Sequence, residues 1–256
     1  MTRQARKAQQ FRGLHVRGKP LILFNIWDAG SAKAVAAAGV TAVATSSWSV
    51  ANANGYADGE QIPLGLAIDN LRRVVAATDL PVTMDIESGY GDTADEVGKN
   101  VALVIDTGAV GCNLEDSFPS NGKLREVHDQ CERIRRARQA GDSAKIAFFI
   151  NARTDVFLQR PARRHIQAMC IETIERAHAY ADAGASGLFT PGLQDLTLIG
   201  GLTKESPLPL NIMVDEGTPS LEELAKHGVA RISHGPRPYL LVMKELEKAA
   251  RVACGL

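Results

Sequence analysis

The chain of 256 residues lacks long apolar segments and any excess of one charge sign. No apolar run reaches the roughly 18 to 20 residues that span a bilayer, and the basic, polar first residues lack the apolar core of a secretory signal. Lysine plus arginine number 29, and aspartate plus glutamate also number 29. This balance argues against a broad nucleic-acid footprint or a polybasic anchor, so we expect neither nucleic acid nor a membrane as a partner.

Paired cysteines are absent as well. The four cysteines are scattered without the spacing of a metal or redox motif: Cys112, Cys131, Cys170 and Cys254. A chain of this size buries a core large enough to fold without disulfides. We therefore expect reduced thiols and a cytoplasmic location.

Motifs that mark other enzyme classes are also missing. The turn after the first predicted strand reads NIWDAGSAKA and has no GxGxxG, which disfavours an open nucleotide-binding sheet. The chain has no GxSxG elbow and no HExxH. An imine-forming aldolase needs a lysine at the active end of a strand. No predicted strand ends in lysine, and Lys145 precedes the fifth strand at the opposite face of the barrel, so this class is disfavoured.

A short β-branched run, a turn and an Ala-rich amphipathic stretch recur along the whole chain. Strands are predicted at 21–26, 41–46, 81–87, 109–115, 146–152, 186–191, 208–214 and 229–233. Helices are predicted near 30–38, 65–78, 93–107, 126–140, 163–183, 193–201, 220–227 and 236–253. Ala38-Gly39, Ala183-Gly184 and His227-Gly228 precede strands and are typical of helix C-caps.

Such alternation predicts a parallel sheet, and about 250 residues is the usual size of a closed (β/α)8 TIM barrel. A doubly wound open sheet is the alternative. No Pro/Gly-rich break divides the chain, so we predict one (β/α)8 barrel domain over residues 1–256.

Acidic residues and one arginine follow three consecutive predicted strands. The third strand ends in Asp85 and Glu87, which share a face because they are two residues apart. The fourth ends in Glu115, and the fifth runs into Arg153. The active face of a barrel lies at these carboxyl ends, so we expect the side chains to converge there.

Clustered carboxylates repel one another unless a cation lies among them. Asp85, Glu87 and Glu115 therefore predict a site for a hard divalent ion, Mg2+ or alternatively Mn2+. Arg153 supplies a planar fork for a carboxylate or enolate oxygen, although it could equally pair with a neighbouring acid, Asp155 or Glu115. A role as a helix N-cap or a surface charge explains three further acids as well as a functional role does: Asp92, Asp116 and Asp155. His234 is either a general acid or base or a cap of the last helix.

The segments FNIWDAGSAKAVAAAGVTAVATSS, MDIESGYGDTADEV, GCNLEDS and INARTDVFL resemble the isocitrate lyase / phosphoenolpyruvate mutase superfamily in order and spacing over about residues 10–245. The resemblance implies a barrel enzyme that binds Mg2+ and an α-oxo or α-hydroxy acid. It also implies a homo-oligomer, a dimer or tetramer, in which neighbours exchange the last helix.

The same resemblance assigns roles to individual residues. Asp85 would ligate the metal, and Glu87 and Glu115 would act largely through bound waters. The substrate would meet the backbone around Ser46, Ser47 and Trp48, the guanidinium of Arg153, Asp58 near the reacting carbon, and Asn211 at the end of the seventh strand.

Two departures from the superfamily pattern bear on the reaction. Isocitrate and methylisocitrate lyases carry a K-[KR]-C-G-H string after the fourth strand, whereas this loop reads DSFPSNGKLREVHDQ and has no cysteine before Cys131. Cys112 lies within the strand and is most simply a core residue. Ser117, Ser120, Asn121 and Lys123 are loose candidates for contacting a transferred phosphorus, but the loop is short. Glu87 stands where many members have Asp, and it still reaches a metal-bound water.

We therefore expect a Mg2+-dependent lyase that cleaves or decarboxylates a small oxo-dicarboxylate, such as oxaloacetate or a substituted malate, through a metal-stabilised enolate. His234 or a water would return the proton. One alternative is a phosphonopyruvate-type C–P bond mutase or hydrolase. Another is a non-catalytic 2-oxo acid binding protein. A third, a phosphate-sugar barrel enzyme, rests on GTPS and HGP after the last two strands.

Overall fold

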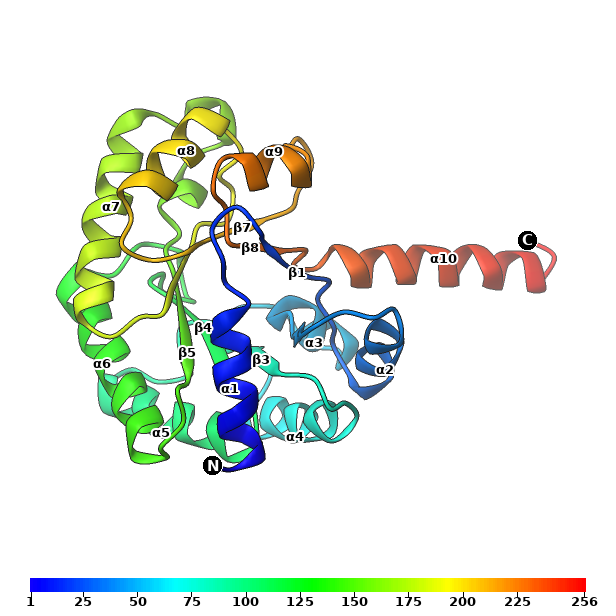
Figure 1. Ribbon diagram of the computed structural model, residues 1–256. Coiled ribbons are helices and arrows are strands. Elements are labelled where there is room, and N and C mark those ends of the chain that lie inside the picture. Colours follow the sequence, from blue (N-terminus) through cyan, green and yellow to red (C-terminus); the bar gives the residue numbers. More distant parts are fainter.

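The computed structural model describes residues 1–256 and contains a ring of eight parallel strands surrounded by helices (Figure 1). The strands are β1 (Leu21–Leu23), β2 (Val43–Ala44), β3 (Val82–Asp85), β4 (Gly111–Glu115), β5 (Phe149–Arg153), β6 (Gly187–Phe189), β7 (Leu210–Met213) and β8 (Arg231–Ser233). Each lies inside its predicted segment or, for β5, one residue beyond it. The predicted (β/α)8 TIM barrel and the eight strands are confirmed.

All eight predicted helices are present, with ends shifted by a few residues. They are α2 (Ala29–Ala37), α4 (Leu64–Ala76), α5 (Ala94–Asp106), α6 (Val127–Ser143), α7 (Gln167–Asp182), α8 (Leu196–Glu205), α9 (Leu221–Lys226) and α10 (Arg237–Ala253). Gly39, Gly184 and Gly228 have φ of 85°, 103° and 84°, so the predicted C-caps are confirmed. Four further elements were not predicted: α1 (Arg3–Gly13), α3 (Ser47–Ala53), η1 (Val156–Gln159) and η2 (Ala162–Arg164).

The ring closes between the first two strands by a single parallel bridge beyond their ladders. Neighbouring strands follow the order β1-β8-β7-β6-β5-β4-β3-β2, and Ile26 pairs with Thr45 across the remaining gap. Ile26 N–H donates to Ala44 O (2.8 Å), and Ser46 N–H donates to Ile26 O (3.1 Å). This seam has fewer backbone hydrogen bonds than the other strand pairs.

Helix α1 covers the end of the barrel opposite the carboxyl ends of the strands. Its buried Phe11 packs edge-on against Phe149, the first residue of β5, with ring centroids 5.5 Å apart. The His15 ring stacks on Phe149 at 3.9 Å, and its Nδ1 contacts Phe11 O at 2.9 Å, while Nε2 is buried without a partner. The first residues, predicted only as basic and polar, therefore form part of the core.

Helix α10 projects away from the barrel (Figure 1). Only its Pro238 is buried, whereas several large apolar side chains are exposed: Leu240, Leu241, Val242, Leu246 and Val252. No helix has both the length and the apolar character needed to cross a membrane. The helix therefore presents an apolar stripe that the chain itself leaves uncovered.

Replacing His15 by phenylalanine should change how stability depends on pH. Burial, and secondarily the charge of Arg231, lower the pKa of His15 to about 3. As pH falls from about 6.5, the unfolded chain binds a proton that the folded chain refuses, so the free energy of unfolding decreases. From pH 7 to pH 5, we expect the free energy of unfolding of His15→Phe to decrease by roughly 1–2 kcal/mol less than that of the wild type, as measured by urea unfolding. Parallel curves for both proteins would contradict the expectation.

Candidate functional site

A cavity of about 180 Å3 opens at the carboxyl ends of the strands. Six of the residues predicted to form the site line it: Ser46, Ser47, Trp48, Asp58, Asp85 and Arg153. Several other lining residues, which lie within or shortly after strands, were not predicted: Asn25, Asn113, Phe189, Met213, Ser233 and Pro236. Their positions near strand ends were the available signal.

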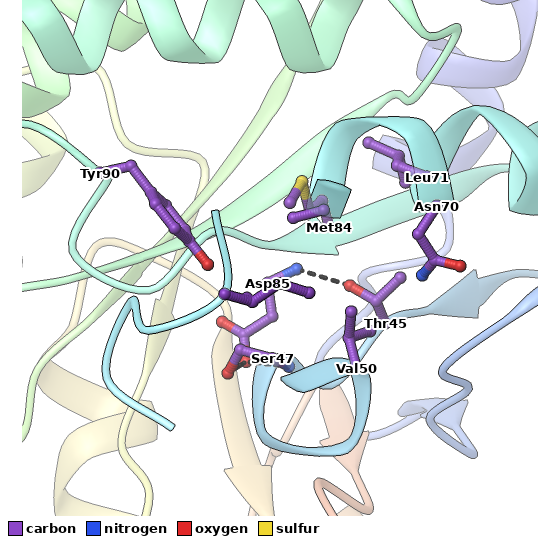
Figure 2. A pocket seen from close by; sticks show the side chains of 10 residues that line it. Thr45, Ser47, Val50, Asn70, Leu71, Met84, Asp85 and Tyr90 are labelled. Carbon is purple, nitrogen blue, oxygen red and sulfur yellow. Dashed lines mark hydrogen bonds between the residues drawn. The ribbon is translucent and has the colours of Figure 1, made fainter. Parts of the chain in front are cut away.

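Asp85, at the end of β3, presents one uncompensated carboxylate oxygen. Ser47 donates to Asp85 Oδ2 through its backbone N–H (3.3 Å) and its hydroxyl (2.9 Å). Asp85 Oδ1 is buried and has no hydrogen-bond partner. Figure 2 shows Asp85 from an adjoining pocket beside α4, with its backbone N–H donating to Thr45 Oγ1 (2.9 Å). That pocket, of about 10 Å3, holds no more than a water, so the larger cavity is the candidate site.

Arg153, at the end of β5, lies between two carboxylates. Its Nη1 is 2.6 Å from Glu115 Oε2, and its Nε and Nη2 donate to Asp155 Oδ1 (2.6 Å) and Oδ2 (3.0 Å). Burial alone would lower the pKa of Arg153, but the two carboxylates raise it. Burial also raises the pKa of Glu115, and Arg153 opposes that shift. Arg153 therefore pairs with both acids while its side chain stays 20% exposed at the cavity.

Buried hydrogen bonds connect this cluster to helix α7. Asp116 Oδ1 accepts from Asp155 N–H (3.0 Å), and Asp116 Oδ2 accepts from Tyr180 Oη (2.7 Å) and Arg176 Nη1 (3.3 Å). Ser117 Oγ donates to Asp155 Oδ2 (2.6 Å). Asp116 therefore holds Asp155, and Asp155 in turn holds the guanidinium of Arg153.

Glu87 and Asp58 belong to two loops that are bonded together. Glu60 N–H donates to Glu87 Oε2 (2.7 Å), while Glu60 Oε1 accepts from Ser88 Oγ and Tyr90 N–H, both at 2.8 Å. Glu60, Glu87 and Tyr90 all have left-handed backbone, with φ of 61°, 53° and 54°. Such conformations are costly for residues other than glycine, so these hydrogen bonds maintain a strained loop pair.

The acids on this side of the cavity raise one another's pKa. Burial, followed by the charges of Asp58 and Asp85, raises the pKa of Glu87 to about 7. Burial and the charge of Asp85 also raise the pKa of Asp58. These carboxylates are therefore close enough to interact without a cation between them.

The structure contains no group of three His, Cys, Asp or Glu side chains arranged to hold one metal ion directly. Glu115 is bound to Arg153, and Glu87 accepts from Glu60 N–H and Tyr90 Oη (3.2 Å). Only Asp85 keeps a buried oxygen without a partner. The donor set fits a hard cation with one direct carboxylate ligand and water-mediated contacts to the other two acids.

Four of the predicted residues do not line the cavity: Glu87, Glu115, Asn211 and His234. Asn211 Oδ1 accepts from Ser233 Oγ (3.2 Å), and its Nδ2 is buried without a partner. The His234 ring Nδ1 contacts Leu23 O (3.2 Å) and packs near Phe24, so the imidazole is directed away from the site. Backbone N–H groups of His234 and Gly235 donate to Asn25 Oδ1, both at 2.9 Å. His234 therefore takes part in this turn through its backbone, and its role as an acid or base stays a prediction.

The loop after β4 forms a small hairpin. Ser117 pairs with Leu124, and the Arg125 guanidinium lies 4.0 Å from the centre of the Phe118 ring. Its exposed tip includes the other loose candidates for phosphorus contact, Ser120, Asn121 and Lys123. None of these residues lines the cavity, and Ser117 turns toward Asp155.

Comparisons with known proteins agree with this architecture. The family model described as phosphoenolpyruvate phosphomutase matches residues 11–253. A crystal structure from Burkholderia cenocepacia J2315, described as a candidate phosphonomutase, is 55% identical, covers 99% of this chain and 100% of its own, and superposes with a TM-score of 0.95. The 2-methylisocitrate lyase of Escherichia coli K12 is 28% identical over 80% of this chain and 69% of its own. Oxaloacetate decarboxylase 2 of Pseudomonas fluorescens Pf0-1 is 27% identical over 73% and 63%.

Replacing Asp155 by asparagine should destabilise the protein. The change removes one of the two charges that neutralise Arg153, whose remaining partner is Glu115. We expect the free energy of unfolding in urea to fall by about 2 kcal/mol. The matched control is Asp195→Asn at the exposed N-cap of α8, where asparagine caps as well as aspartate. Equal effects of the two substitutions would contradict the importance of the Arg153 cluster.

Proposed function

Because the chain belongs to the phosphoenolpyruvate phosphomutase family, we propose that it is a Mg2+-dependent carbon–carbon lyase acting on a small 2-oxo or 2-hydroxy acid through a metal-stabilised enolate. The main support is the unpaired, buried Oδ1 of Asp85 in a cavity that also exposes Arg153. A carboxylate oxygen without a partner favours a cation, and Arg153 favours an anionic ligand beside it.

Asp85 would hold the ion directly, and Glu87 and Glu115 would act through bound waters. Mg2+, with Mn2+ as the alternative, supplies positive charge for the 2-oxo oxygen and so stabilises an enolate. The uncompensated repulsion among Asp58, Asp85 and Glu87 supports this assignment, because a divalent ion would relieve it.

The chain's own groups bind and orient the substrate in this proposal. Ser46, Ser47 and Trp48 would contact its carboxylate, and Arg153 would donate to oxygens that become more negative in the transition state. Asp58 lies on the cavity wall, and its raised pKa suits it to hold a proton near C3. Asn211 would contribute only through Ser233, which does line the cavity.

Carbon–carbon chemistry is favoured over carbon–phosphorus chemistry by the hairpin after β4. Its polar tip does not reach the cavity, so no side chain from it would meet a transferred phosphoryl group. Loss of CO2 makes the smallest demand on the site, because the enolate then needs only one proton. A relative named oxaloacetate decarboxylase supports the same choice.

We also propose a homo-oligomer, a dimer or tetramer, in which α10 is exchanged between copies. The apolar stripe of α10 is exposed, and a groove of about 490 Å3 beside α2 is lined by apolar side chains that include Phe24, Trp27 and Val35. A second copy of α10 matches this groove in chemistry. The four free cysteines support a reducing, cytoplasmic location.

The proposed function is tested by assaying a panel of oxo and hydroxy acids with Mg2+ and with EDTA. We expect turnover of an oxo acid such as oxaloacetate or of a substituted malate with Mg2+, and none with EDTA. Turnover of isocitrate or methylisocitrate would contradict our interpretation of the hairpin. Turnover of phosphonopyruvate would favour the C–P alternative, and tight oxalate binding without any turnover would indicate a binding protein.

In the same assays, Asp85→Asn should abolish the Mg2+-dependent activity and weaken oxalate binding at least about tenfold in calorimetry. Stability in EDTA should stay equal or rise, because one repelling charge is removed. Asp92→Asn, in an exposed turn outside the cavity, is the matched control and should behave as wild type.

The oligomer is tested by placing a charge on the apolar stripe of α10. Leu246→Glu should shift the protein to monomers in analytical ultracentrifugation, because burying an unpaired carboxylate costs several kcal/mol. Arg251→Gln, an exposed position that faces away from both Leu246 and Val252, is the control and should leave the assembly unchanged. A wild-type monomer, or an unaffected Leu246→Glu oligomer, would refute helix exchange.

A further inference from the structure

The cavity has two chemically different sides that follow the strand order. Asp85 on β3 and Arg153 on β5 place charged groups on one arc. Phe189 on β6, Met213 on β7 and Pro236 after β8 form most of the next arc, called here the apolar arc, which also includes the hydroxyl of Ser233 at the end of β8. Arg153 is paired in register with Phe189, so the two arcs meet at one strand boundary.

No residue of the apolar arc is positive, and Arg153 reaches only its edge, where the guanidinium carbon lies 5.9 Å from the centre of the Phe189 ring. Arg153 is the only lysine, arginine or histidine among the lining residues, and its guanidinium already pairs with Glu115 and Asp155. Arg231 on β8 is buried beneath the cavity, where it donates to Ser233 Oγ (3.4 Å) and Asn113 Oδ1 (3.1 Å) without lining the opening. The imidazole of His234 contacts Leu23 O. An anionic group placed against Met213 and Pro236 would therefore lose water without forming a direct ion pair.

We infer that the apolar arc receives the carboxylate that the substrate loses as CO2. The inference rests on the proposed function and specifies where the reacting carbon–carbon bond lies: C1 and the 2-oxygen toward Asp85 and Arg153, and C4 toward Phe189, Met213 and Pro236.

The chemistry of decarboxylation matches this division. The C3–C4 bond breaks, its electron pair forms a C2–C3 double bond, and negative charge moves onto the 2-oxygen while neutral CO2 leaves. C3 then takes one proton from solvent, which balances the conversion of an oxo-dicarboxylate to an oxo-monocarboxylate and CO2. Negative charge therefore leaves the apolar arc and reaches the charged arc in the transition state, which is stabilised relative to the bound substrate.

A phosphonate in place of C4 fits the same arc poorly. It keeps its charges throughout binding, and the arc offers no donor cation to compensate them. The site should therefore discriminate against phosphonopyruvate at the binding step.

The test places a cation on the apolar arc. Met213 is a half-buried, unbranched residue at the end of β7, so lysine and glutamine fit there as a charged and a neutral replacement of similar length. For Met213→Lys we expect a lower KM for oxaloacetate together with a kcat reduced by about tenfold or more, because the cation stabilises the carboxylate that must leave. Met213→Gln, which adds polarity without charge, should reduce kcat by a smaller factor than Met213→Lys does. Rates are corrected for decarboxylation by Mg2+ alone.

Two controls separate the possible failures. Oxalate, which has no C3 or C4, should inhibit all three proteins equally, and this shows that the charged arc is intact. If wild type does not exceed the rate of Mg2+ alone, the proposed function fails and the inference falls with it. If wild type is active but Met213→Lys has an equal or higher kcat, or if phosphonopyruvate binds wild type as tightly as oxaloacetate, the inference alone is overturned.

Discussion

The candidate site depends on one buried cation, Arg153, held between Glu115 and Asp155. Three charges at the ends of two adjacent strands are tolerated there only because each neutralises another. Through Asp155 and Asp116 the cluster is also bonded to α7, so the outer helix layer fixes the direction of a guanidinium inside the barrel mouth. In the proposed function, the contacts of the substrate's anionic end would thus be set before any ligand arrives.

Across the cavity the balance of charge is reversed. Asp58, Asp85 and Glu87 face one another without a cation, and strained backbone at Glu60 and Glu87 holds two of their loops together. The strained backbone of these loops keeps the acids close together, and such an arrangement would favour a positive ligand. The cavity thus has an acidic side, a single arginine and a neighbouring apolar arc. In the inferred reaction, negative charge would move from the apolar arc toward the charged side.

Periodicity and strand ends were sufficient to predict the barrel and the cavity residues Asp85 and Arg153, because both follow from side-chain alternation and the parallel arrangement of the strands. Four other cavity residues came only from the family resemblance: Ser46, Ser47, Trp48 and Asp58. Helix α1 was missed because its polar composition hides one core ring, that of Phe11, which packs on Phe149 together with His15 just after the helix. The direction of the His234 ring, which contacts Leu23 O beside the turn that Asn25 holds, could not be predicted from the sequence. The apolar arc could not be predicted either, because it requires knowing which residue of each strand faces inward at the rim.

The seam at Ile26 and Thr45 lies beside the same cavity, since Asn25 and Ser46 flank it and both line the opening. A cylinder joined by so few backbone bonds along one side is most easily deformed there, because local opening requires least free energy where fewest bonds must break. The mechanical weak point of the barrel and the edge of its ligand chamber therefore coincide, and a bound molecule touching both flanks would stiffen the whole ring.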